Sequence, residues 1–187
     1  VEVGKGELVC VELEEKEEIS TRELYDCSAL IACGRKKNGK YVHILSHMIH
    51  CVPDRELNKQ MDLILHIFEH LLSLEEVEVY LDGFICQEES LLTKLKSFKD
   101  KLAGKTKVSI DESKNTWRPE IRGEPVKEGV VILTRQGVST RHIDFRPERK
   151  GIVQSRFYQW KLSCNGKVGT LSPDNDEYGS TLTMIPP

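Results

Sequence analysis

Apolar residues in the N-terminal part of the chain follow patterns typical of β-strands. Residues 6–13 alternate between apolar and polar side chains, which predicts a first strand. Two continuous apolar runs follow over 27–32 and 41–45, and Asn38-Gly39 in the polar stretch between them is a hairpin signal. Segment 14–26 is acidic and polar, and we expect a loop or a short helix there. These patterns predict an N-terminal hairpin of two buried strands.

Two later segments have the periodicity of amphipathic helices. The first begins at Pro53-Asp54, with Asp54 suited to the N-cap, and its apolar stripe consists of Leu57, Met61, Ile64, Leu65, Phe68 and Leu72. The second runs from about residue 87 to 103, and Gly104 is suited to the C-cap. Residues 77–82 between them read as a strand. The order hairpin, helix, strand, helix follows.

The rest of the chain is rich in predicted strands. A short strand over 107–110 precedes a polar linker, 111–128, and residues 130–134 and 141–145 form strands around Gln136-Gly137. Residues 152–187 contain two or three more strands, expected over 157–162, 168–171 and 181–184. We therefore predict an α/β (α+β) sandwich, with mixed sheets flanked by two main helices. Residues 1–150 form its main domain, and 151–187 form a β-rich C-terminal extension packed on the same domain.

Composition narrows the range of partners. A net charge of −3 over 187 residues gives no argument for nucleic acid as a partner. No apolar stretch is long enough to span a bilayer and no signal peptide is evident, so we expect a soluble, cytoplasmic protein without membrane insertion. The six cysteines include no Cys-x-x-Cys pair, and we interpret them as reduced. The sequence does not predict the oligomeric state.

Thr21, Cys27 and His43 are the residues that point most directly to chemistry, because an imidazole can take the proton of a nearby thiol. Which histidine faces Cys27 depends on the register of the hairpin. A two-residue turn at Asn38-Gly39 places His50 opposite Cys27, whereas a longer loop over 34–40 places His47 there. His43 and His47 share a face of the strand and His50 lies on the other. Hairpin geometry alone therefore leaves the partner of Cys27 open.

Three other interpretations use the same residues or other histidines. Cys27 starts a buried strand, where cysteine commonly serves as a small apolar side chain, and the protein is then a non-enzymatic interaction domain. On the first predicted helix, His66, Glu69 and His70 match the H-x-x-E-H zinc motif, although they also lie on its polar face. A structural zinc site is the third interpretation, with the ligands His43, His47, His50 and Cys51.

The pattern Thr21-x5-Cys27-x15-His43 resembles the CheD family of chemoreceptor glutamine deamidases and the catalytic domain of the cytotoxic necrotizing factors. The opening residues, Val3-Gly4-Lys5-Gly6-Glu7, are also similar to the N-terminal strand of that family. The resemblance covers roughly residues 1–145. The chain differs from the family at Tyr25-Asp26, where Gly-Ser usually precedes the cysteine.

This resemblance implies a cysteine-dependent protein-glutamine deamidase that needs no cofactor and no metal. Cys27 would attack the side-chain amide carbon of a glutamine on the surface of a partner protein. His43 would move the proton, Thr21 would orient the imidazole, and the backbone N–H of Cys27 or Ser28 would stabilise the oxyanion. A chemotaxis regulator and a toxin-like effector domain delivered to a host cytosol both fit, and deamidation is not separated from transglutamination.

Overall fold

The computed structural model describes residues 1–5, 7–25, 27–49, 62, 64–65, 68, 74–84, 88–122, 124–144, 160–164, 167–171 and 183–185. The helical elements described along their length are α2 (Glu88–Leu102) and the 3-10 turn η3 (Glu112–Lys114), and residues 62, 64 and 65 are also helical. The strands are β1 (Glu7–Val11), β2 (Glu18–Leu24), β3 (Cys27–Lys36), β4 (Tyr41–Ile49), β5 (Leu74–Phe84), β6 (Lys107–Ile110), β7 (Thr116–Arg118), β8 (Glu120–Ile121), β9 (Glu124–Pro125), β10 (Lys127–Thr134), β11 (Gly137–Asp144), β12 (Trp160–Cys164), β13 (Lys167–Leu171) and β14 (Thr183–Ile185). The fold is therefore mixed α/β and built mainly from strands.

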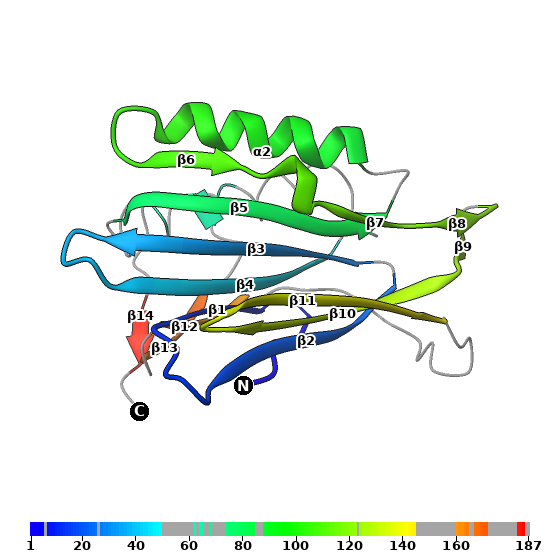
Figure 1. Cartoon of the computed structure of the whole chain (residues 1–187), viewed down its shortest axis with the longest axis horizontal. Helices are drawn as coiled ribbons and strands as arrows, with labels where there is room; N and C mark the ends of the chain where they lie inside the picture. The colour runs from blue at the N-terminus through cyan, green and yellow to red at the C-terminus, as the bar shows by residue number, and fades with distance from the viewer. Residues whose placement is uncertain are drawn as a thin grey trace.

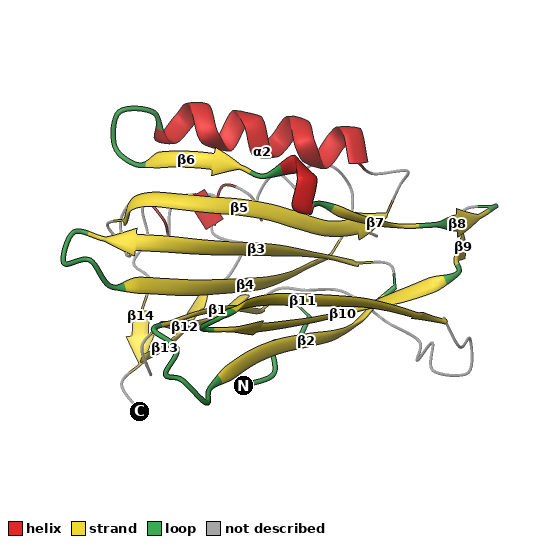
Figure 2. Ribbon diagram, in the orientation of Figure 1, coloured by secondary structure: helices red, strands yellow, loops and turns green. Residues whose placement is uncertain are grey.

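The elements form three layers, which Figure 1 and Figure 2 show from the side with α2 at the top. The middle layer is a mixed sheet in the order β14-β13-β12-β1-β4-β3-β5-β6, with β7 pairing beside β5. A smaller sheet, β11-β10-β2, lies against the face of this sheet that is remote from α2. β8 and β9 form a separate short hairpin at one end of the molecule.

Strand β3 lies in the interior of the middle sheet, and its residues Cys27–Ala32 are buried on both faces. A strand covered on both faces reads as a continuous apolar run, which explains the sequence of this segment. Leu30 and Ala32 face the core beneath α2. Cys27 and Ile31 face the second core, between the middle sheet and the smaller sheet. Each face of β3 therefore belongs to a different core.

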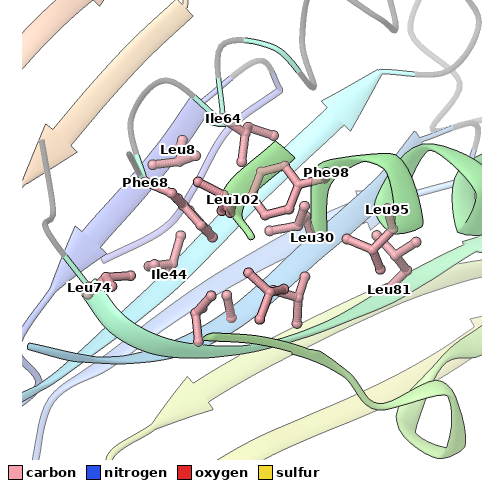
Figure 3. Close-up of a cluster of buried hydrophobic side chains, with 14 of the residues drawn as sticks. Leu8, Leu30, Ile44, Ile64, Phe68, Leu74, Leu81, Leu95, Phe98 and Leu102 are labelled. Atoms are coloured by element: carbon pink, nitrogen blue, oxygen red, sulfur yellow. The ribbon is translucent and has the colours of Figure 1, made fainter. Parts of the chain in front are cut away.

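The core beneath α2 depends on one apolar stripe of the helix (Figure 3). The stripe repeats every three or four residues, and its buried members are Leu91, Leu95, Phe98 and Leu102. Phe98 meets Phe68 edge to face, with ring centroids 5.2 Å apart. Ile64 is also buried in this core, although most of the segment around it lies outside the described residues. The helix is thus fixed to the sheet by apolar contacts.

The turn between β3 and β4 sets the register of the hairpin. The Lys36 N–H donates to the Lys40 carbonyl at 2.9 Å, and the Gly39 N–H donates to the Lys36 carbonyl at 2.9 Å. Gly39 has a φ of 82°, the left-handed conformation that closes a three-residue hairpin loop. This loop places Ile49 opposite Cys27. The register lies between the two considered from the sequence, which put His47 or His50 opposite Cys27.

Several predicted elements are confirmed, and two are wrong. The polar linker expected over 111–128 contains η3, β7, β8, β9 and the start of β10. The second helix and the strands over 77–82, 107–110 and 130–134 are present. Segment 14–26 was expected to be a loop or a short helix, but it contains β2, which pairs with β10. Ser20 and Thr21 are buried polar residues of that strand. Because they are polar, the sequence lacks the apolar pattern from which a buried strand is predicted. The helix predicted from Asp54 lies outside the described residues except at 62, 64, 65 and 68.

The C-terminal strands extend the middle sheet. β12 pairs in parallel with β1, and β13 and β14 follow in antiparallel order. The described part of residues 151–187 therefore adds strands to the sheet that contains β3. No helix in the described part of the chain is long and apolar enough to cross a membrane.

Replacing Phe98 by alanine should lower the free energy of unfolding by about 3–5 kcal/mol, because it leaves a cavity against Phe68. Denaturation in urea measures the change. Lys99→Ala, at an exposed neighbouring position of α2, is the matched control and should stay within about 0.5 kcal/mol of the parent protein. Equal effects of the two substitutions would show that the stripe does not hold α2 to the sheet.

Candidate functional site

Thr21 and His47 form a buried hydrogen-bonded pair between the two sheets. Thr21 on β2 is 0% exposed and His47 on β4 is 1% exposed. The Thr21 Oγ1 lies 2.8 Å from the His47 Nδ1 and 2.8 Å from the Val3 carbonyl oxygen. The two contacts join the N-terminal segment, the smaller sheet and the middle sheet.

The two hydrogen bonds of Thr21 determine which nitrogen of His47 carries the proton. A hydroxyl has one proton, and a carbonyl oxygen can only accept, so the Thr21 hydroxyl donates to Val3. Its oxygen must then accept a proton from the Nδ1–H of His47. The lone pair of a neutral His47 ring is therefore on Nε2, where an imidazole acts as a base.

Cys27 begins β3 on the same face of the sheet as His47. The register pairs Cys27 with Ile49 and Ala29 with His47, and side chains paired across strands share a face. Cys27 and His47 are thus diagonal neighbours on adjacent strands. Their Cα atoms are about 7–8 Å apart, a separation that a long side chain can span. Cys27 is reduced and 1% exposed. The structure therefore brings a thiol, an imidazole and a hydroxyl to one end of the sandwich.

The expected approach of His43 to Cys27 is not what the structure shows. His43 pairs with Cys33, and Ile49, the partner of Cys27, lies six positions farther along β4. At about 3.3 Å per residue this separation is about 20 Å. The three-residue turn puts His43 on the same face as Cys27 and His47 but near the other end of β3. The imidazole that meets Thr21 is instead that of His47.

His43 lines a surface groove at its own end of the sheet, with Glu12, Leu13, Glu14, Cys33, Lys40, Tyr41 and Arg135. Its side chain is 6% exposed, and its Nδ1 is buried without a hydrogen-bond partner. Burial, and secondarily the positive charge of Arg135, lowers the pKa of His43 below the ordinary 6.5. The fold therefore favours the neutral form of this imidazole.

A second polar cluster, built on Asp82, lies beside the Thr21–His47 pair. Asp82 on β5 pairs with Ala29, so its side chain shares the face of His47 and Cys27. Its carboxylate accepts hydrogen bonds from Thr116 Oγ1 at 2.9 Å and from Arg118 Nη1, and it lies 2.8 Å from His142 Nε2. Asp82 and Arg118 are both fully buried. The carboxylate and the guanidinium neutralise each other inside the protein.

The sequence singled out neither Asp82 nor Arg118. Arg118 falls in the predicted linker 111–128, and His142 reads as an exposed residue of a strand. An acidic residue at the end of an apolar strand, directly before Gly83, is the one local signal for Asp82. Its partners come from β7 and β11, which are far away in the sequence, so only the fold brings them together.

The Ser28 side chain lies on the opposite face from Cys27. A Cβ added to Gly83 would be 2.5 Å from Ser28 Oγ and 2.9 Å from Trp117 Cζ3, which places Ser28 on the α2 side of the sheet. The predicted oxyanion role concerns the backbone N–H of Ser28, which follows the Cys27 carbonyl directly. That role stays a prediction.

The zinc interpretations rest largely on residues that are not described. His50, Cys51, His66, Glu69 and His70 lie outside the described residues. Within the described ranges no group of three or more His, Cys, Asp or Glu residues is placed to hold a metal ion. His43 and His47 are four positions apart on one strand, about 13 Å, which is too far for both to bind one ion at about 2 Å.

The chain just before Cys27 holds a strained residue. Glu23 has a φ of 56°, in the left-handed region that only glycine adopts without cost. The Tyr25 N–H donates to the Glu23 carbonyl at 3.0 Å and closes a tight turn between β2 and β3. Such strain costs on the order of 1–3 kcal/mol and recurs at functional sites. Here it lies near the end of β2, four residues before the candidate nucleophile in the chain.

The neutral state of His43 predicts a loss of stability in acid. The unfolded chain binds a proton near the ordinary pKa of 6.5, whereas folded His43 binds one only at lower pH. The unfolded state therefore holds more protons over that interval, and the free energy of unfolding falls as the pH drops below about 6.5. Urea denaturation across this range should show a smaller loss in His43→Gln. An unchanged slope would mean that folded His43 titrates normally.

The sequence matches no protein-family model and no curated protein. A functional assignment therefore rests on the arrangement of Cys27, His47 and Thr21, together with the motif resemblance.

Proposed function

We propose that this protein is a cysteine-dependent amidohydrolase that converts a glutamine side chain of a partner protein to glutamate. Cys27 is the nucleophile, His47 is the acid and base, and Thr21 orients the imidazole. The observation that carries the proposal is the hydrogen bond from His47 to Thr21, since it puts the ring proton on Nδ1 and the basic lone pair on Nε2 of an imidazole that shares the face of Cys27. His47 takes the role that the sequence assigned to His43.

The reaction proceeds through a thioester. His47 Nε2 takes the proton of the Cys27 thiol, and the thiolate attacks the carbonyl carbon of the side-chain amide. The C–N bond of the tetrahedral intermediate then breaks, and the proton on Nε2 leaves with the nitrogen as ammonia. A water molecule, deprotonated by Nε2, attacks the thioester and releases the glutamate side chain and the Cys27 thiol. The atoms balance without a cofactor.

The substrate class comes from the motif resemblance. Thr21 and Cys27 occupy the positions quoted for the CheD-like pattern, and the histidine comes from the next strand in the chain, as in that pattern. The spacing differs, because His47 lies four positions beyond His43. The resemblance supports a glutamine side chain as the substrate, and the site geometry supports the thiol chemistry.

The burial of the site requires an opening step. Thr21, Cys27 and His47 are each at most 1% exposed, so a glutamine side chain needs a path between β2 and the start of β3. Relief of the left-handed backbone at Glu23 would offset part of the cost of moving this segment. The strain thus supports the C-terminal end of β2, around Glu23, as the part that moves.

The burial of Cys27 also favours a second candidate, a non-enzymatic interaction domain. In that case Cys27 is an apolar side chain of the second core, with Ala29, Ile31 and Leu45 as neighbours. The two functions differ in the chemistry of the thiol. A core cysteine reacts slowly and independently of His47, whereas a nucleophile depends on that imidazole.

Alkylation with iodoacetamide, followed by peptide mass spectrometry, measures the reactivity of Cys27 against pH. The rate should rise with a midpoint clearly below about 8.5, the value of an ordinary thiol, because His47 stabilises the thiolate. His47→Ala should return the midpoint toward about 8.5 and slow the reaction at neutral pH at least about tenfold. A mixture of glutamine-containing peptides then tests conversion of amide to acid, which Cys27→Ala should abolish.

His43→Ala is the matched control, because it removes the same side chain from the same face of β4. It should leave the rate of Cys27 alkylation within about twofold of the parent protein. A Cys27 that reacts with an ordinary midpoint, whatever residue stands at 47, would support the interaction domain and rule out the amidohydrolase.

A further inference from the structure

We infer that Arg118 is the positioning residue of Cys27, holding the backbone at the nucleophile through its guanidinium while Asp82 neutralises its charge. The inference rests on the proposed function, and it adds a residue that neither the motif nor the Thr21–His47 pair includes. Arg118 is fully buried, with Asp82 Oδ1 on one side of its guanidinium and the Cys27 carbonyl oxygen on the other.

The Cys27 carbonyl lies beyond the end of the β3–β5 ladder. That ladder begins at the pair Ala29–Asp82, so β5 forms no strand pair with Cys27. Along its other edge, β5 pairs with β7 from Asp82 to Phe84, and Arg118 is the last residue of β7. Its Nη2 donates to the Cys27 carbonyl in place of a ladder amide. The nucleophile is therefore held by β4 along one edge and by the Arg118 side chain along the other, where β5 no longer pairs with β3.

The surroundings of Arg118 are shaped for a planar cation. Gly129 on β10 has no side chain, and an added Cβ would be 2.4 Å from Arg118 Nη1 and 3.1 Å from Asp82 Oδ1. Thr116 donates to the other oxygen of Asp82 at 2.9 Å, and His142 Nε2 contacts that same oxygen. Strands β5, β7, β10 and β11 thus all contribute to one enclosed ion pair.

A planar fork of donors gives this contact its directional effect. The guanidinium binds two acceptors at a fixed angle, which an ammonium group on a flexible stem does not do. Because the peptide group is planar, fixing the Cys27 carbonyl also fixes the direction of the Ser28 N–H, the predicted oxyanion donor. Arg118 thereby sets the orientation of the peptide group that joins Cys27 to Ser28.

The pH profile of Cys27 alkylation in Arg118 variants tests the inference, because it separates positioning from simple exposure of the thiol. Arg118→Ala should move the midpoint toward about 8.5 and slow the reaction at neutral pH about tenfold. Millimolar ethylguanidinium should restore the low midpoint in that variant. Arg118→Lys keeps a cation beside Asp82 without the planar fork, and it should fold while it shows the same loss.

Arg35→Ala is the matched control. Arg35 donates to Glu76 at 2.8 Å at the other end of β3 and is a third exposed, with 34% of its side chain accessible. This variant should keep the parent midpoint and show no response to ethylguanidinium.

The outcomes separate the inference from the proposed function. A folded Arg118→Lys that keeps the low midpoint, while His47→Ala loses it, overturns the positioning role and leaves the amidohydrolase in place. A parent protein whose Cys27 has an ordinary midpoint overturns the proposed function, and the positioning inference with it. Loss in both Arg118 variants with rescue of the alanine variant by ethylguanidinium supports the inference. Loss without any rescue counts against it.

Discussion

The register between β3 and β4 is the constraint on which the candidate site depends. A side chain changes face with every one-residue shift of a strand, and a two-residue shift moves it about 7 Å along the sheet. The left-handed Gly39 fixes the loop at three residues, and the two cores on either side of β3 admit no other alternation. This register puts His47, and not His43, beside Thr21 and diagonal to Cys27.

Two polar groups are buried at the same end of this apolar sandwich. The Thr21–His47 pair and the Asp82–Arg118 pair lie on one face of the middle sheet, beside Cys27. A buried ion pair rarely adds stability over apolar residues, because desolvation of the charges opposes their attraction. Both pairs instead fix directions: one fixes the tautomer of an imidazole, and the other the carbonyl of a cysteine. Buried polar groups that cost desolvation free energy and gather at one place in a fold are typical of a functional site.

The sequence predicted the local features of this fold and missed those that depend on distant contacts. The stripe of α2 and the buried run of β3 are strong periodic patterns, and both predictions are confirmed. β2 was missed because Ser20 and Thr21 are buried through hydrogen bonds and packing that no local pattern reveals. The sequence named Thr21 and Cys27, but the choice of histidine required a register. Arg118 was beyond prediction, since its partners Asp82 and Cys27 lie far away in the sequence.

In the proposed function, Thr21 holds His47 in the tautomer that makes it a base for Cys27. Long-range proton–nitrogen NMR correlations of the His47 ring test this directly at neutral pH. We expect a neutral ring with its proton on Nδ1 and an unprotonated Nε2, and we expect Thr21→Val to disturb this state. A neutral ring with its proton on Nε2 would rule out this role of His47, because such a ring has no lone pair at Nε2 for the thiol proton.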